Sequence, residues 1–202
     1  MTPRAPLLVA TTNPGKLHEI AGILHGLPIE LLTLRDVPAL EEPEETGTTF
    51  ADNARLKALY YARRTGLLTV ADDSGLEIDA LDNAPGVHSA RWHGTDYAVK
   101  FAKIRELLAV RGRDGSAARF VCAIAVARGD LVVYEATGTV HGVLAPEPRG
   151  INGFGYDPIF VYPPLNRTLA ELDPVEKSGV SHRGQAFHRL RDHLLSHPDL
   201  FG

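Results

Sequence analysis

The sequence predicts an α/β fold with a mixed β-sheet, and two observations carry this prediction. Amphipathic helices alternate with short apolar strands in the first half of the chain, and a clear β-hairpin follows in the second half. Helices mixed with both local and distant strands are typical of α/β proteins with a mixed sheet. The 202 residues contain no internal repeat, low-complexity tract or Ser/Gly linker, so we expect a single domain over residues 1–202.

In the first half, residues 6–10 form an apolar run that predicts a strand, because it ends in the turn chemistry of residues 11–16. A second strand is expected over residues 29–34, and the acidic stretch 41–47, which contains proline and glycine, is expected to be a loop. Two helices are predicted from apolar residues that share one face. These are Leu17, Ile20, Ala21 and Leu24 in the first helix, and Phe50, Ala54, Ala58 and Tyr61 in the second, which Thr48 or Thr49 can cap.

The second half begins with a short strand over residues 67–71 that leads directly into Asp72-Asp73-Ser74-Gly75. A helix is predicted over residues 97–110, and alternating residues predict a hairpin of strands 118–127 and 131–140. The remaining predictions are a glycine-rich loop over 150–158, a strand over 159–162, a helix start at Asp173, and a final helix capped by Ser181 that buries Phe187, Leu190 and Leu194.

Composition and charge exclude several classes of protein. Lys and Arg number 21 against 25 Asp and Glu, a net charge of −4, whereas gripping nucleic acid by its phosphates usually needs a basic excess. No run of about 18 uncharged apolar residues is present, and residues 1–10 lack the cleavage pattern of a signal peptide. Cys122 is the only cysteine, which excludes a disulfide framework and a cysteine-based zinc cage. We therefore expect a cytoplasmic protein with no nucleic-acid or membrane partner.

The first candidate for chemistry is the segment Thr11–Lys16, which follows a strand and opens a helix. Backbone N–H groups at a helix start, together with a lysine, suit a phosphate. The segment is not a Walker A loop, because the early glycine is missing and Leu17 stands where that motif needs a hydroxyl. An ordinary strand-to-helix turn is the alternative.

The second candidate is the pair Asp72-Asp73, expected at the end of a buried strand. Two adjacent carboxylates repel, so a low-dielectric site favours a divalent cation or a raised pKa. Ligands of open α/β sheets usually bind at the carboxyl ends of strands. The alternative is a solvated Asp-Asp-Ser-Gly turn.

The third candidate is the run of four glutamates between residues 41 and 45, which by itself predicts a solvated loop. It gains interest only if the loop folds over the aspartates, since magnesium in phosphate-transfer sites takes one or two protein carboxylates and phosphate oxygens. Asn53 and Lys57 share a helix face and could point at the same phosphates. A surface pair is the alternative.

The fourth candidate combines Phe154-Gly155-Tyr156-Asp157 with Lys177 and Ser181-His182-Arg183. Glycines flanking an aromatic residue let a flat ring lie against the backbone, as a base-stacking slot requires. His182 and Arg183 are expected in the first turn of a helix, beside free amides. A packed loop aromatic and a basic helix start on the surface are the alternatives.

The order of these motifs along the chain is specific. It runs Thr-Thr-Asn-x-x-Lys, Glu-Glu-Thr-Gly-x-Thr-Phe-x-x-Asn-Ala-x-x-Lys-Ala, Ala-Asp-Asp-Ser-Gly-Leu, Gly-Phe-Gly-Tyr-Asp-Pro-Ile-Phe and Glu-Lys-x-x-x-Ser-His-Arg-Gly-Gln-Ala. From Leu8 to about Leu190 the chain thereby resembles the inosine triphosphate pyrophosphatase family, and residues 84–92 resemble it as well. These enzymes hydrolyse dITP, ITP and XTP to the monophosphate and pyrophosphate, which keeps such nucleotides out of DNA and RNA.

The resemblance implies an elongated mixed β-sheet with flanking helices, two lobes around a central cleft, magnesium dependence and a homodimer. It implies that Glu45 and Asp73 bind the metal, with Glu42 or Glu44 as alternatives to Glu45, and that Asp73, beside Asp72, is the catalytic general base. The residues implied to bind the triphosphate are Thr11, Thr12, Asn13, Pro14, Gly15 and Lys16, assisted by Asn53 and Lys57. Those implied to bind the rest of the substrate are Ser74, Phe154, which stacks on the purine, and Gly155, Tyr156, Asp157, Lys177, His182 and Arg183.

Purine selectivity is expected to depend on the 6-position, where hypoxanthine and xanthine present an oxygen and adenine an amine. A buried donor such as Arg183 would be left unpaired against adenine. A Maf-type nucleotide pyrophosphatase is the alternative enzyme, but the motifs at 154–157 and 181–183 disfavour it. A regulator that binds nucleotides without catalysis is disfavoured by the carboxylate pair, because binding phosphates alone does not need one.

Overall fold

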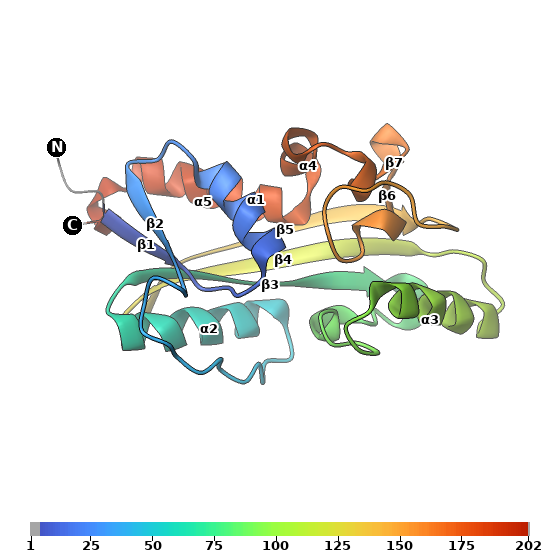
Figure 1. Ribbon diagram of the computed structural model, residues 1–202, viewed down its shortest axis with the longest axis horizontal. Coiled ribbons are helices and arrows are strands. Elements are labelled where there is room, and N and C mark those ends of the chain that lie inside the picture. The colour runs from blue at the N-terminus through green and yellow to red at the C-terminus, as the bar shows by residue number, and fades with distance from the viewer. Residues whose placement is uncertain (1–4, 202) are drawn as a thin grey trace. The chain divides into compact units, whose positions relative to one another are not determined.

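The computed structural model describes residues 5–201 (Figure 1), so residues 1–4 of the stretch without a cleavage pattern lie outside it. Over the described residues the strands are β1 (Ala5–Val9), β2 (Ile29–Thr33), β3 (Leu68–Ile78), β4 (Ala117–Arg128), β5 (Leu131–Leu144), β6 (Phe160–Tyr162) and β7 (Arg167–Thr168). The α-helices are α1 (Pro14–Leu24), α2 (Phe50–Thr65), α3 (Tyr97–Val110), α4 (Pro174–Val180) and α5 (His182–Ser196). None of these helices is long and apolar enough to cross a membrane.

Within residues 5–201 the strands form one seven-stranded sheet in the order β2-β1-β3-β4-β5-β6-β7. Strand β1 pairs in parallel with both β2 and β3, whereas β6 pairs antiparallel with β5 and with β7. Both kinds of pairing are present, which confirms the predicted α/β class with a mixed sheet. The predicted hairpin is also confirmed, since β4 and β5 are neighbours in the sheet and only Gly129 and Asp130 separate them in the chain.

The chain divides into two compact units. The first contains Met1–Asp73, Cys122–Gly138 and Arg183–Gly202, and the second contains Ser74–Val121 and Thr139–His182. Strands β3, β4 and β5 each contribute residues to both units, so the boundaries between the units fall within these three strands. The prediction of a single domain over the whole chain stays a prediction.

In the first unit, α1 and α5 cover one face of the sheet and α2 covers the other (Figure 1). Helix α1 packs Ile20, Ile23 and Leu24 into the same core as the buried face of α5. The expectation that Ala21 is buried is wrong, because Ile23 takes that place and Ala21 is exposed. Helix α2 buries Phe50, Ala54, Ala58 and Tyr61 as predicted, and Thr49 is its cap, accepting a hydrogen bond from the Asp52 amide.

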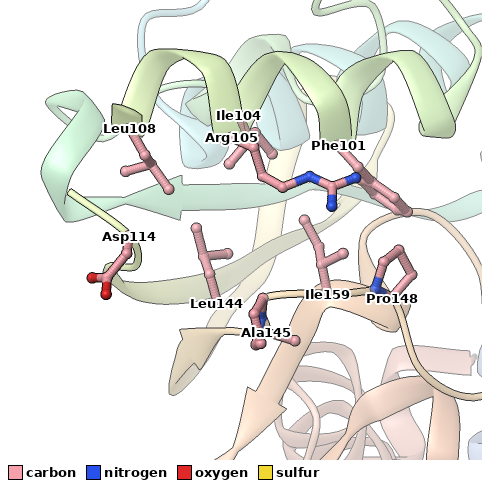
Figure 2. Close-up of a pocket in the computed structure, with 10 residues that line it drawn as sticks. Phe101, Ile104, Arg105, Leu108, Asp114, Leu144, Ala145, Pro148 and Ile159 are labelled. Atoms are coloured by element: carbon pink, nitrogen blue, oxygen red, sulfur yellow. The ribbon is translucent and has the colours of Figure 1, made fainter. Parts of the chain in front are cut away.

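The second unit has its own core, in which Phe101, Ile104 and Leu108 of α3 pack on residues of β3 and β4. The helix spans the predicted residues, and its Asp96 cap starts it by accepting a bond from the Ala98 amide. A small pocket of about 90 Å³, lined mainly by apolar side chains together with Arg105 and Asp114, remains beside α3. Figure 2 shows the α3 side chains on one side of this pocket and Leu144, Ala145 and Ile159 on the other. No candidate site residue lines it.

The main difference from the predicted elements is in β3. This strand does not end at Ala71, because it continues through Asp72-Asp73-Ser74-Gly75 to Ile78. The four residues favour turns when considered alone. Here both aspartates are buried and ion-paired, so tertiary contacts override the local preference.

The core of the second unit predicts a stability difference along α3. Leu108→Ala should lower the free energy of unfolding by about 3 kcal/mol, because Leu108 is buried and the adjoining pocket shows that the site does not collapse to fill space. Val110→Ala on the same helix is the control, since Val110 is 78% exposed, and it should change stability by less than about 0.5 kcal/mol. Urea denaturation measures both, and equal losses would contradict this packing.

Candidate active site

Residues Thr11–Lys16 form the connection from β1 to α1. Asn13 is the cap of α1 and accepts a hydrogen bond from the Lys16 amide at 3.1 Å, while Thr11 Oγ1 accepts one from the Asn13 amide at 3.2 Å. Pro14 occupies the first helical position, where its missing N–H costs nothing. The capping residue Asn13 and Pro14 thus fix where α1 begins, and this places Lys16 in the first turn of the helix.

Asp72 and Asp73 lie side by side in β3, just beyond the point where its partner β1 ends at Val9. Successive side chains of a strand point to opposite faces of the sheet. Asp72 therefore meets Lys16 of α1 and Arg183 of α5, whereas Asp73 meets side chains of α2, which covers the other face (Figure 1). The two carboxylates therefore have different ion-pair partners, although the charges of Lys16 and Lys57 act on both of them. The alternative of a solvated turn is excluded because both are buried.

On the face of α1 and α5, Asp72 is the centre of a buried charged network. Its Oδ2 lies 2.9 Å from Lys16 Nζ and 3.4 Å from an Arg183 terminal nitrogen, and the other terminal nitrogen of Arg183 donates to Glu19 at 2.7 Å. Burial by itself raises the pKa of Asp72, but Lys16, Arg183 and Lys57 outweigh it and hold that pKa well below the ordinary value. Asp72 is thus a fixed negative charge.

On the face of α2, Asp73 contacts the two residues that were predicted to share a helix face. Asn53 Nδ2 donates to Asp73 Oδ2 at 3.0 Å, and Lys57 Nζ lies 3.7 Å from Oδ1. Burial raises the pKa of Asp73 despite the opposing effects of Lys57 and Asn53. The pKa of Lys57 is also raised, because the carboxylates around it outweigh the effect of its burial. The pair Asn53 and Lys57 is therefore part of the cluster, not a surface pair.

The acidic loop reaches this cluster through Glu45, and a second glutamate contacts the connection between β1 and α1. Glu45 is half-buried and its Oε1 accepts from Lys57 Nζ at 2.5 Å, whereas Glu42 accepts from Thr12 Oγ1 at 2.9 Å. Glu42 is exposed, as are Glu41 and Glu44. The loop also helps to line a cavity of about 370 Å³, next to Thr11 and Thr12. The loop thus folds over the charged cluster at Glu45, as a role of its glutamates in metal binding requires.

Glu45 and Asp73 form a donor set that fits magnesium. Both carboxylates lie against the same ammonium group of Lys57, so a cation is accommodated between oxygen ligands there. Over residues 5–201, no three His, Cys, Asp or Glu side chains come together in a group able to hold a metal ion. Two carboxylates correspond to what magnesium takes from the protein when phosphate oxygens complete its shell.

The second unit contains a separate cluster around the Phe154–Asp157 loop. Asp157 Oδ2 accepts from Lys177 Nζ at 2.5 Å and from the Phe154 amide at 2.7 Å. The same ammonium lies 4.9 Å from the centre of the half-buried Phe154 ring. Gly153 has a positive φ, and a Cβ there would lie 2.3 Å from Asp157 Oδ2, so only glycine allows this approach.

Two further predicted base-pocket residues are packed deeper in this unit. Tyr156 is buried and its hydroxyl donates to the Ser89 carbonyl at 3.0 Å. His182 is buried and stacks on Phe120 at 4.6 Å between ring centres. Ser89 and Phe120 were missed by the sequence analysis, although Ser89 lies inside the family-like segment 84–92.

The predicted site residues thus fall into two groups. Those in the first unit are Thr11, Thr12, Asn13, Pro14, Gly15, Lys16, Glu45, Asn53, Lys57, Asp73 and Arg183, and those in the second are Ser74, Phe154, Gly155, Tyr156, Asp157, Lys177 and His182. Arg183 is the unexpected member of the first group, because its side chain binds Asp72 and Glu19. That Arg183 lines a base pocket stays a prediction. Glu19, which was also missed, is three residues from Lys16 on α1, a spacing that places both on one helix face.

The network around Asp72 predicts a pH-dependent stability difference. Asp72→Asn should cost about 3 kcal/mol near neutral pH, because it leaves Lys16 and Arg183 without the carboxylate they face. A depressed pKa contributes stability above the unfolded value of 3.8, and that contribution is lost as the pH falls toward the folded pKa. The difference from wild type should therefore be constant above about pH 5 and shrink below about pH 4.

Urea denaturation across this pH range measures the effect. Asp82→Asn is the control, since Asp82 pairs with Arg111 on the surface at 2.8 Å, and it should cost less than about 1 kcal/mol. A cost for Asp72→Asn that grows as the pH falls would contradict the assigned direction of the pKa shift.

Comparison with known proteins shows which family this chain resembles. The model of the Ham1 family matches residues 7–193. A dITP/XTP pyrophosphatase of Exiguobacterium sp. is 46% identical over 189 residues, which cover 94% of this chain and 96% of that protein. One of Geobacter sulfurreducens is 49% identical over 191 residues, with 93% and 96% covered.

Solved structures give the same result. A HAM1 protein from Coxiella burnetii superimposes with a TM-score of 0.85 at 42% identity, covering 95% of this chain and 99% of that one. The Staphylococcus aureus Ham1 protein gives a TM-score of 0.83 at 34% identity, covering 95% and 98%. The family resemblance inferred from the motifs is confirmed, and this chain belongs to the Ham1 family.

Proposed function

We propose that this chain hydrolyses the non-standard purine nucleoside triphosphates dITP, ITP and XTP to the monophosphate and pyrophosphate. The observation that carries the proposal is the charged cluster of the first unit. In this cluster Lys16 Nζ lies 2.9 Å from Asp72 Oδ2, and Lys57 Nζ lies 3.7 Å from Asp73 Oδ1. A lysine in the first turn of a helix, as Lys16 is in α1, suits phosphates, and a buried carboxylate beside a cation suits proton transfer. The names of the relatives, dITP/XTP pyrophosphatases, support the same reaction. Such an activity cleanses the nucleotide pool, which prevents incorporation into DNA and RNA.

In this reaction Asp73 is the general base. It takes a proton from a water whose oxygen bonds to the α-phosphorus, while the bond from that phosphorus to the oxygen bridging to the β-phosphate breaks. The leaving pyrophosphate keeps the bridging oxygen, and Lys16 and Lys57 stabilise its charge. Burial raises the pKa of Asp73, which brings it closer to the pH at which a general base works best.

Magnesium is the cofactor of the proposal, held by Glu45 and Asp73. When bound, it neutralises phosphate charge and supplies Lewis-acid assistance to the reacting phosphoryl group. Glu45 is favoured over Glu42 and Glu44 because its carboxylate contacts Lys57, the same side chain that faces Asp73.

The second cluster supplies the base contacts of the proposal. Phe154, with the ammonium of Lys177 near its ring, is a platform on which a purine stacks. Lys177, oriented by Asp157, is a donor for the 6-oxo group of hypoxanthine or xanthine. The 6-amino group of adenine cannot accept a hydrogen bond from this ammonium, and mismatches of this kind cost about 10⁴-fold in favourable cases.

The proposal includes two properties that the sequence resemblance and composition suggest, a homodimer and a cytoplasmic location. The nucleotide substrate supports the second, because nucleotide pools are used where nucleic acids are made. Size-exclusion chromatography with light scattering tests the first, and a mass of one chain would reject it.

Pyrophosphate release from ITP, XTP, dITP, GTP, ATP and dTTP tests the proposal. With magnesium, turnover of the first three should exceed that of ATP and GTP by orders of magnitude, and EDTA should abolish it, because the phosphates then lose their counter-cation. Asp73→Asn should reduce kcat by about 10²–10⁴-fold, the range for loss of a general base. Equal turnover of all six nucleotides would reject the base contacts, and tight ITP binding without turnover would favour a regulator.

If Phe154 stacks on the base, its replacement should change KM for ITP more than kcat. Phe154→Ala should raise KM for ITP about tenfold and change kcat less, since stacking on a base is worth about 1–3 kcal/mol and is made before the reaction. Phe154→Tyr keeps the ring and should stay near wild type. Steady-state kinetics measures both variants, and an unchanged KM in Phe154→Ala would remove Phe154 from the site.

A further inference from the structure

Asn53 of α2 is fully buried, and both ends of its side-chain amide are used inside the protein. The Gly47 amide donates to Asn53 Oδ1 at 2.8 Å, and Asn53 Nδ2 donates to Asp73 Oδ2 at 3.0 Å. Because a backbone N–H can only donate and a carboxylate can only accept, these partners fix which end of the amide is oxygen. The side chain has one orientation compatible with both.

This amide determines how the Asp73 carboxylate is turned. With Oδ2 bound to Asn53, it is Oδ1 that faces Lys57, at 3.7 Å. A hydrogen bond to an ionised acceptor is about twice as strong as one between neutral groups, so the amide is an effective restraint on the carboxylate. The Lys57 ammonium that Oδ1 faces is also the one that contacts Glu45, at 2.5 Å.

The same amide also ties down the end of the acidic loop. A Cβ at Gly47 would lie 2.6 Å from Asn53 Oδ1 and 2.9 Å from the backbone nitrogen of Asn53. The loop therefore comes closer to Asn53 than a residue with a side chain allows. Glu45 stands two residues before this contact. One buried side chain therefore connects the loop that carries Glu45 with the strand that carries Asp73.

We propose that Asn53 is a positioning residue that holds the two carboxylates of the charged cluster in their relative places. This inference rests on the proposed function. It differs from the direct phosphate contact that the family resemblance implies, because Asn53 is buried and bonded at both ends, and so acts through Asp73 and Gly47. Mutation of residues that orient metal-binding side chains typically lowers metal affinity or activity about 10–100-fold, and we expect a loss of this size when Asn53 is replaced.

Asn53→Asp tests the proposal with almost no change in shape. The variant keeps an acceptor for the Gly47 amide but places a carboxylate oxygen against Asp73 Oδ2, where an N–H donates in the wild type. We expect kcat for ITP to fall about 10–100-fold, with KM within about threefold and more magnesium needed for half-maximal rate. Asn83→Asp, the same change at an exposed position of the second unit, is the matched control and should keep wild-type kinetics.

Asn53→Ala is the second variant, which adds no charge and serves if Asn53→Asp does not fold. It should lower kcat similarly and should also accelerate hydrogen exchange at the Gly47 amide, whereas Asn53→Asp should leave that amide protected. A folded Asn53→Asp or Asn53→Ala with wild-type kcat overturns the proposal, and so does a rise in KM of more than tenfold at unchanged kcat, which indicates direct substrate contact.

Hydrogen exchange separates this inference from the proposed function. If the wild type releases no pyrophosphate from any nucleotide, the proposed function fails, while exchange at Gly47 still decides whether Asn53 holds the loop. Unchanged Gly47 exchange in Asn53→Ala overturns the inference even when the wild type is active.

Discussion

The alternation of side chains along β3 is the constraint on which the charged cluster depends. A strand sends neighbouring residues to opposite faces, so the adjacent Asp72 and Asp73 have different ion-pair partners. Asp72 faces Lys16 and Arg183, and Asp73 faces Asn53 and Lys57. One stretch of extended chain therefore meets charged residues from three helices, α1, α5 and α2.

The two faces give the neighbouring aspartates opposite electrostatic character. Three cationic side chains hold the pKa of Asp72 well below its ordinary value, whereas burial raises that of Asp73. Environments that push two carboxyl pKa values apart separate a permanently charged residue from one that exchanges protons. Cys122, whose Sγ lies 3.9 Å from Asp72, has its pKa raised to about 12 by burial and so stays a protonated, unreactive thiol.

Much of this arrangement could be predicted from the sequence. Periodicity located α2, α3 and the β4–β5 hairpin, and the spacing of Asn53 and Lys57 correctly placed both on one face. The path of β3 could not be predicted, because Asp-Asp-Ser-Gly is local turn chemistry. Partners distant in the chain, which are the neighbouring strands and the ion-paired helices, keep it extended. The partners of Arg183 were missed for the same reason, since Asp72 and Glu19 lie more than a hundred residues away in the chain.

The continuity of β3 has a consequence for how this sequence can change. Inserting or deleting one residue before Asp72 would turn every later side chain to the opposite face. After a deletion Asp73 would face Lys16 and Arg183 and Ser74 would face α2, and after an insertion Asp72 would face α2 and Ala71 the two cations. Either shift leaves one face without its carboxylate, so two identical neighbours do not make the segment tolerant of length variation. Variation in chain length is therefore expected in the loops that flank this strand, not within it.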